Sequence, residues 1–111
     1  MENSEFEWDE DKAENNLKKH RVSFDEAATI FNDPNVATIP DPDHSEAEDR
    51  FVSVGRSFIA RILTVIHTFR NTRIRLISAR KATKAEKKNY ENRKEKEEKR
   101  NHAGRIRFQQ S

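Results

Sequence analysis

A helical repeat of apolar residues is the clearest pattern in the chain, and it lies at residues 24–31. Four apolar residues there are spaced at i, i+3, i+4 and i+7, which places them on one helix face: Phe24, Ala27, Ala28 and Phe31. Ser23 to Glu26 reads S-x-x-E, a capping box whose side chains satisfy the first free backbone N–H groups of a helix. The pattern predicts a helix that begins after Ser23 and ends at Asn32-Asp33-Pro34.

An earlier helix is predicted from a cap at Asp9 to about His20. Its only inward candidates are Ala13 and Leu17, and Trp8, which precedes the cap, is expected to fold back over them. Most of this helix should face solvent, because its other residues are polar.

Alternation of apolar and polar residues replaces the helical repeat in the middle of the chain. The strands that it predicts are 36–39, 50–56, 59–69 and 73–79, with a possible edge strand at 5–8. Turns are expected at 55–58 and 71–72, and such short connections predict an antiparallel meander. An acidic, proline-containing loop at residues 40–49 separates the first of these strands from the others.

The last predicted element begins with a second capping box, Thr83 to Glu86. It should continue as a helix through Tyr90 into a Lys- and Glu-rich stretch that ends near Arg100, followed by a tail. Apart from Ala85 and Tyr90 this helix has almost nothing to bury, so it should be solvated or await a partner.

Composition indicates a single domain with a small core. The chain has 111 residues, of which 32% are hydrophobic and 38% are charged. We expect an α+β fold over residues 1–92, with two N-terminal helices, a small antiparallel sheet of about four strands and one C-terminal helix. A charged extension of that helix and a tail occupy residues 93–111.

Several classes of site are missing from the sequence. Without cysteine there is no disulfide or thiolate metal ligand, and the two glycines form no phosphate-binding loop. The H-E-x-x-H and G-x-S-x-G motifs do not occur, and the acidic run at residues 41–49 lacks the glycine and closing Glu of a calcium loop. No apolar run suits a membrane span or secretory signal, so we expect a cytoplasmic protein without metal or cofactor.

Charge is divided sharply between the two halves of the chain. Residues 1–49 contain four Lys and Arg against fifteen Asp and Glu, and residues 50–111 contain eighteen against five, so the halves carry about −11 and +13. Residues 50–85 include no acid at all. A folded surface this basic predicts a polyanionic partner.

The central strands carry the first candidate site. Strand alternation would send Arg61 and His67 to one face, and Arg73 and Arg75 to one face of the next strand. If these faces coincide, an imidazole lies among guanidinium groups that need an anion to relieve their repulsion. Alternatively, the arginines form a solubilising surface and His67 is a structural residue.

The second candidate site follows the last strand, where Ser78 to Thr83 leads into a helix. Free N–H groups of the first helical turn bind anions, and Arg80 and Lys81 would add two cations beside them. The alternative is a basic linker with an ordinary helix cap. Tyr90 is expected either to pack against the sheet or to stack on a base.

A family resemblance rests on motifs that run in order from residue 6 to about residue 92. They are F-E-W-D at 6–9, Lys12, N-L at 16–17, K-H at 19–20, V-S-F-D-E-A at 22–27, F-N-D-P at 31–34, R-I-R-L-I-S-A-R-K-A-T at 73–83, Glu86 and Y-E at 90–91. In this order and spacing the chain resembles the BrnT family of type II toxins.

The resemblance implies a RelE-like fold and a ribonuclease activity that cleaves RNA, inhibits translation and arrests growth. It also implies a BrnA-type antitoxin whose ribbon-helix-helix portion dimerises and represses the shared operon. The chain would then belong to a toxin–antitoxin hetero-oligomer and would meet operator DNA only through the antitoxin.

The resemblance also suggests which residues act on RNA. The implied catalytic set is His67, Arg61, Arg80 and Tyr90, with no metal ligand. The basic residues of the acid-free stretch are expected to bind RNA and its phosphates: Arg50, Arg73, Arg75, Lys81 and Lys84. Arginines and Lys81 would stabilise the phosphate, and His67 would transfer the proton, because free imidazole titrates near neutrality. The alternative is a noncatalytic module whose basic sheet binds nucleic acid or an acidic partner.

Overall fold

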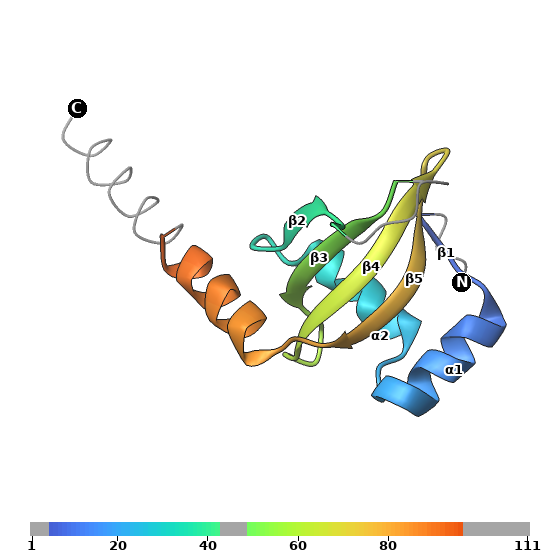
Figure 1. Ribbon diagram of the computed structural model, residues 1–111, viewed down its shortest axis with the longest axis horizontal. Coiled ribbons are helices and arrows are strands. Elements are labelled where there is room, and N and C mark those ends of the chain that lie inside the picture. Colours follow the sequence, from blue (N-terminus) through green and yellow to red (C-terminus); the bar gives the residue numbers. More distant parts are fainter. Residues whose placement is uncertain (1–4, 43–48, 97–111) are drawn as a thin grey trace.

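A single five-stranded sheet forms the centre of the protein, and the two N-terminal helices lie on one of its faces (Figure 1). The computed structural model describes residues 5–42 and 49–96. The elements are β1 (Phe6–Glu7), α1 (Glu10–His20), α2 (Phe24–Ala28), the 3₁₀ helix η1 (Thr29–Asn32), β2 (Ala37–Pro40), β3 (Phe51–Arg56), β4 (Ile62–Arg70) and β5 (Arg73–Lys81). Residues 84–96 are helical and are called the C-terminal helix here.

The sheet has the strand order β1-β5-β4-β3-β2, and the predicted meander is confirmed because β2 to β5 pair antiparallel in sequence order. The possible edge strand also forms: β1 pairs parallel with β5, with Phe6 opposite Ile74. The sheet therefore has five strands rather than about four. A register shift between Ile66 and His67 marks an irregularity in the pairing of β4 with β5.

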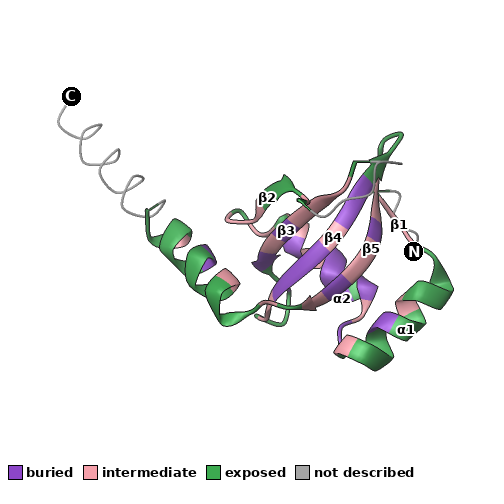
Figure 2. Cartoon of the chain, viewed as in Figure 1, coloured by how far each residue is buried: buried purple, intermediate pink, exposed green. Residues whose placement is uncertain are grey.

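Both predicted N-terminal helices form where their caps indicated. The Asp9 carboxylate accepts a hydrogen bond from the Asp11 N–H at 2.8 Å, and the Ser23 hydroxyl accepts one from the Glu26 N–H at 3.0 Å. Side chains of α2 and η1 form the core together with the inward residues of β4 and β5: Val22, Phe24, Ala27, Ala28, Ile30, Leu63, Val65, Leu76 and Ala79. Most of the buried residues thus lie on α2, β4 and β5, whereas the C-terminal helix is mostly exposed (Figure 2).

Gly55 allows β3 to approach η1 closely. A Cβ atom at this position would lie 3.1 Å from Ile30 Cβ and 3.1 Å from Val36 Cγ2. Either contact is shorter than ordinary van der Waals packing, so a larger residue would push strand and helix apart.

The predicted inward position of Leu17 is wrong. Leu17 is 47% exposed, and Asn16 is the buried residue of α1. The Asn16 amide nitrogen donates to the carbonyls of Val22 and Ala79, each at 2.9 Å, and its oxygen accepts from the Ala79 N–H at 3.1 Å. A polar side chain lies inside because backbone groups of β5 and of the α1–α2 connection need its hydrogen bonds.

The predicted start of the long central strand at residue 59 is also wrong, since β4 begins at Ile62. Residues 57–61 instead form a turn in which the Ser57 N–H donates to the Arg61 carbonyl and the Ala60 N–H donates to the Ser57 carbonyl, each at 2.8 Å. Ala60 has a φ of 68° in this turn. Arg61 therefore belongs to a turn, and the alternation that placed it on one strand face with His67 does not apply.

The last strand of the sheet is longer than predicted, because β5 continues two residues beyond Ala79 to Lys81. Residues 43–48 of the acidic loop, the predicted helix end near Arg100 and the tail lie outside the described residues. In the described part of the chain, no helix has the length and apolar character that a membrane crossing requires.

Candidate functional site

A basic pocket of about 450 Å³ lies where β3 and β5 end and the C-terminal helix begins. Four cationic residues line it, together with one carboxylate: Arg56, Arg61, Lys81, Lys87 and Glu91. The small side chains Ala60 and Ala82 also line it and leave its centre open. Such a concentration of positive charge around a hollow suits an anion.

Arg61 reaches this pocket but is already paired. Its Nε donates to Glu26 Oε2 at 2.9 Å, and its Nη2 bonds both Glu26 Oε1 and the Arg21 carbonyl. The hydrogen bond from Arg61 lowers the pKa of Glu26, and Ser57 Oγ donates to the same carboxylate at 2.6 Å. Glu26 thus ties the turn of residues 57–61 to α2.

Arg80 is also paired, on the sheet face opposite α2. Its Nη1 and Nη2 donate to the two oxygens of Glu86 at 2.8 and 3.0 Å, and the Thr64 hydroxyl donates to the same carboxylate. The predicted capping box of Thr83 and Glu86 is confirmed in both directions. Because Arg80 donates to it, the pKa of Glu86 falls to about 2. A carboxylate therefore occupies the predicted phosphate seat.

His67 lies in the interior, among aromatic rings. Its side chain is 0% exposed, and Nε2 is 2.7 Å from Ser53 Oγ. The ring centroids of Phe31, Phe51 and Phe69 lie 5.0, 6.0 and 5.5 Å away. Burial lowers its pKa to about 4, so the imidazole is neutral at pH 7. The expected convergence of His67 with guanidinium groups is wrong, because its neighbours are phenyl rings.

Tyr90 anchors the C-terminal helix to Asp33 at the end of η1, and its burial agrees with a packing role. It is 2% exposed, and its hydroxyl donates to Asp33 Oδ2 at 2.6 Å. Burial and the neighbouring Asp33 carboxylate raise the Tyr90 pKa to about 12. The same Asp33 oxygen accepts from the Arg56 N–H at 2.8 Å, which fixes the end of β3.

The remaining predicted cations are spread over the protein. Arg73 and Arg75 face Glu7 of β1, with N···O distances of 3.9 and 3.0 Å. Arg50 immediately precedes β3, at the end of that strand remote from the basic pocket, and Lys84 is exposed in the first turn of the C-terminal helix. Of all the predicted site residues, the basic pocket brings together only Arg61 and Lys81.

Three charged residues of the pocket were not among the site residues predicted from the sequence: Arg56, Lys87 and Glu91. Lys87 and Glu91 are four residues apart on a predicted helix, a spacing that places them on one face and could have paired them. Nothing in the strand pattern indicated that Arg56 would meet that face.

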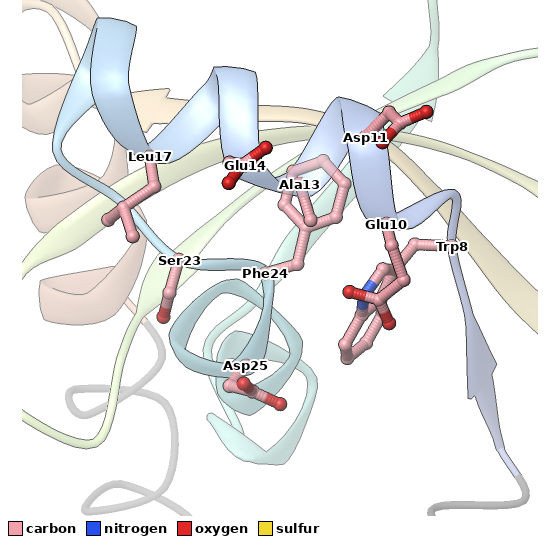
Figure 3. A pocket seen from close by; sticks show the side chains of 9 residues that line it. All are labelled: Trp8, Glu10, Asp11, Ala13, Glu14, Leu17, Ser23, Phe24 and Asp25. Carbon is pink, nitrogen blue, oxygen red and sulfur yellow. The ribbon is translucent and has the colours of Figure 1, made fainter.

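A second large hollow, of about 550 Å³, lies between α1 and α2 (Figure 3). Apolar side chains including Trp8, Leu17 and Phe24 line it, together with four carboxylates: Glu10, Asp11, Glu14 and Asp25. This acidic groove would repel a phosphate. Of these two hollows, only the basic pocket suits an anion.

Two of three comparisons with known proteins found a match. Residues 8–86 match the model of a protein family. This family is described as the ribonuclease toxin BrnT of type II toxin–antitoxin systems. The crystal structure of the Brucella abortus ribonuclease toxin BrnT is similar, with a TM-score of 0.57 and 23% sequence identity, covering 72% of this chain and 97% of that chain. At this identity the likeness concerns the fold. A comparison with curated proteins finds no match.

Proposed function

Because the chain belongs to the BrnT ribonuclease toxin family of type II toxin–antitoxin systems, we propose that it is an endoribonuclease that cleaves RNA in the basic pocket. The observation that carries this proposal is the pocket itself, with four cations and one carboxylate around about 450 Å³. Cleavage of messenger RNA there would inhibit translation in the cytoplasm and arrest growth.

The scissile phosphate would bind to Lys81, Lys87 and Arg56. Lys81 and Lys87 are exposed and come from the end of β5 and from the C-terminal helix. Arg61 and Arg80 would be positioning residues, because each guanidinium is held by a carboxylate of the protein. Cations placed where charge develops on the phosphoryl oxygens stabilise the transition state.

The chemistry we propose is attack of a ribose 2′-OH on the adjacent phosphorus, without a metal ion. Glu91, the carboxylate in the pocket, accepts the 2′-OH proton, the new P–O bond forms, and the bond to the 5′ oxygen breaks. A lysine ammonium protonates the leaving oxygen, so the products are a 2′,3′-cyclic phosphate and a 5′-hydroxyl. The predicted catalytic roles of His67 and Tyr90 stay predictions, and the burial of both side chains favours Glu91 as the base.

Replacement of the pocket lysines tests the proposal. We expect Lys81→Ala and Lys87→Ala each to slow cleavage of a messenger RNA by about 10²-fold, because each removes a cation from the transition state. Lys88→Ala, which changes the exposed neighbour of Lys87, is the matched control. Gel analysis of the RNA, with and without ribosomes, provides the measurement, and unchanged cleavage by both pocket variants would reject the site.

The same assay decides the noncatalytic alternative. A binding module would retain RNA strongly at low salt and release it at high salt, without a cleaved product. Cleavage by the wild-type protein that the lysine variants lose would exclude this alternative.

For the antitoxin, we propose a BrnA-type protein with a ribbon-helix-helix portion that covers the basic pocket with an acidic segment. The resulting hetero-oligomer would bind operator DNA through the antitoxin alone. Co-expression with the neighbouring reading frame should yield a complex that does not cleave RNA. A complex in which cleavage persists would place the antitoxin elsewhere.

A further inference from the structure

A smaller hollow of about 310 Å³ adjoins the basic pocket, and Arg56 lines both. Its walls are Asn32 and Pro34, which follow α2, and Phe58 in the turn between β3 and β4. The turn continues directly into Ala60 and Arg61, which line the basic pocket. A ligand that spans both hollows would meet the cations of the basic pocket and the aromatic ring of the smaller hollow.

Phe58 is displayed to solvent by a braced turn. The residue is 74% exposed, more than the other large hydrophobic residues of the described chain. Its N–H donates to Thr29 Oγ1 at 3.0 Å, and the preceding Ser57 hydroxyl is held by Glu26. Ala60 adopts a left-handed conformation, which a residue with a Cβ accepts only when its surroundings hold it. The fold thus holds the backbone of a turn whose phenyl ring is exposed and takes no part in the core.

We propose that this hollow is a nucleobase subsite for single-stranded RNA, with one base stacked on Phe58. The inference rests on the proposed function, since the phosphate of the same RNA would lie in the basic pocket. Aromatic rings beside cations are the usual means of binding unpaired nucleotides, because every base has a face that can stack. The smaller hollow, with its phenyl ring, and the basic pocket, with its cations, share Arg56 and so offer both kinds of contact.

Asn32 supplies the polar group of the subsite. Its exposed side-chain amide has both a donor and an acceptor, which matches the edge of a base. Asp33 lines the same hollow, but its oxygens already accept from Asn35 N–H, Arg56 N–H and Tyr90 OH. Asp33 therefore shapes the wall, and Asn32 is the residue that would discriminate between bases.

The test compares Phe58→Ala with Phe69→Ala in the full-length protein. Phe69 is 54% exposed at the far end of β4, and so is a matched phenylalanine remote from the basic pocket. We expect Phe58→Ala to weaken binding of a short single-stranded RNA by about 10-fold and Phe58→Tyr to retain it. An RNA carrying 2-aminopurine should lose fluorescence on binding wild type and Phe58→Tyr, because stacking quenches that base. Melting curves check folding.

The outcomes separate this inference from the proposed function. If wild type cleaves RNA but Phe58→Ala binds and quenches equally well, the subsite is absent and the ribonuclease remains. If Phe58→Ala loses the antitoxin but keeps RNA binding, Phe58 contacts a protein instead. A wild-type protein that neither binds nor cleaves RNA would overturn both proposals.

Discussion

Burial changes what a single residue can do, and His67 shows this most clearly. A histidine in water titrates near pH 6.5, which makes it an attractive proton carrier. Within the cluster of Phe31, Phe51 and Phe69 its pKa falls to about 4, since no water solvates the charged form. The imidazole here packs among aromatic rings and hydrogen-bonds Ser53.

The lowered pKa predicts how stability depends on pH. The unfolded chain takes up a proton on His67 as pH falls below about 6.5, whereas the folded protein resists until about pH 4. The contribution of neutral His67 to the free energy of unfolding is therefore fully present above pH 6.5, and it is lost as the pH falls from 6.5 to about 4. Denaturant unfolding at pH 5 should show about 2 kcal/mol less stability than at pH 7 from this residue.

Substitution isolates this effect from those of other titrating groups. The variant His67→Leu should lose most of this pH dependence over the same window, while His20→Gln, a change on α1, should retain it. Equal pH dependence in the two variants would show that other groups are responsible.

Glu91 is exposed in the pocket, whereas His67 and Tyr90 are buried, and this difference favours Glu91 as the proposed proton acceptor. The change Glu91→Gln should lower kcat by about 10²-fold while RNA binding is kept, because the amide cannot accept the proton. Glu95→Gln alters a carboxylate one turn later in the same helix and should leave kcat unchanged. Single-turnover cleavage with saturating enzyme measures both, and an active Glu91→Gln enzyme would require another base.

Ion pairs and polar side chains, rather than apolar contacts alone, position the elements around the basic pocket. Glu26 and Arg61 join α2 to the turn before β4, and Glu86 and Arg80 join the C-terminal helix to β5. Glu86 also accepts from the Thr83 N–H and so completes the capping box of its helix, whereas the Glu26 carboxylate accepts from Ser57 and Arg61.

A double-mutant cycle measures the Glu26–Arg61 connection. The side chain of Glu26 is 6% exposed, so removal of Arg61 leaves a buried charge without its partner. We expect a coupling energy of about 1–3 kcal/mol between Glu26→Gln and Arg61→Met in the free energy of unfolding. The same cycle on the more exposed pair of Glu7 and Arg75 should yield less than about 1 kcal/mol. Equal coupling energies for the two pairs would mean that burial does not strengthen the Glu26–Arg61 interaction.

Asn16 performs the equivalent role between α1 and β5. Its three hydrogen bonds to backbone groups are buried, so Asn16→Ala should destabilise the protein by about 2–3 kcal/mol. Asn15→Ala, at an exposed position of the same helix, should cost less than about 0.5 kcal/mol. Urea unfolding followed by circular dichroism compares the two, and similar losses would contradict the hydrogen-bond assignment.

At the scale of the whole molecule, the division of charge along the chain becomes a division in space. The acidic groove lies between α1 and α2 (Figure 3), and the basic pocket lies where the C-terminal helix begins after β5. An RNA chain would be repelled by the first and attracted by the second.

Salt should reveal this arrangement. If the basic pocket neutralises two phosphates of a single strand, the logarithm of the binding constant should fall with the logarithm of salt concentration with a slope of about −1.4. Lys87→Ala should reduce the slope by about 0.7, whereas Lys18→Ala, on α1, should not alter it. Fluorescence anisotropy across a salt series gives the slope, and identical slopes in all three proteins would place the RNA outside the pocket.

Local sequence patterns determined much of the architecture. Caps at Asp9, Ser23 and Thr83 set three helix starts, and alternation identified the strands, because both signals depend on neighbouring residues. The family was also recognisable, since its motifs follow one another in order. The divisions at residues 92 and 93 and the RelE-like assignment stay predictions.

Tertiary structure alone decided which charged and polar groups meet. Residue type marked Arg61, His67 and Arg80 as candidates for the site. In the structure Arg61 pairs with Glu26 and Arg80 pairs with Glu86. His67 is enclosed by phenyl rings. Conversely, Arg56, Lys87 and Glu91 gather in one pocket although they belong to β3 and the C-terminal helix. Periodicity reports on which face of its own element a residue lies, whereas burial and ion pairing depend on what packs against that face.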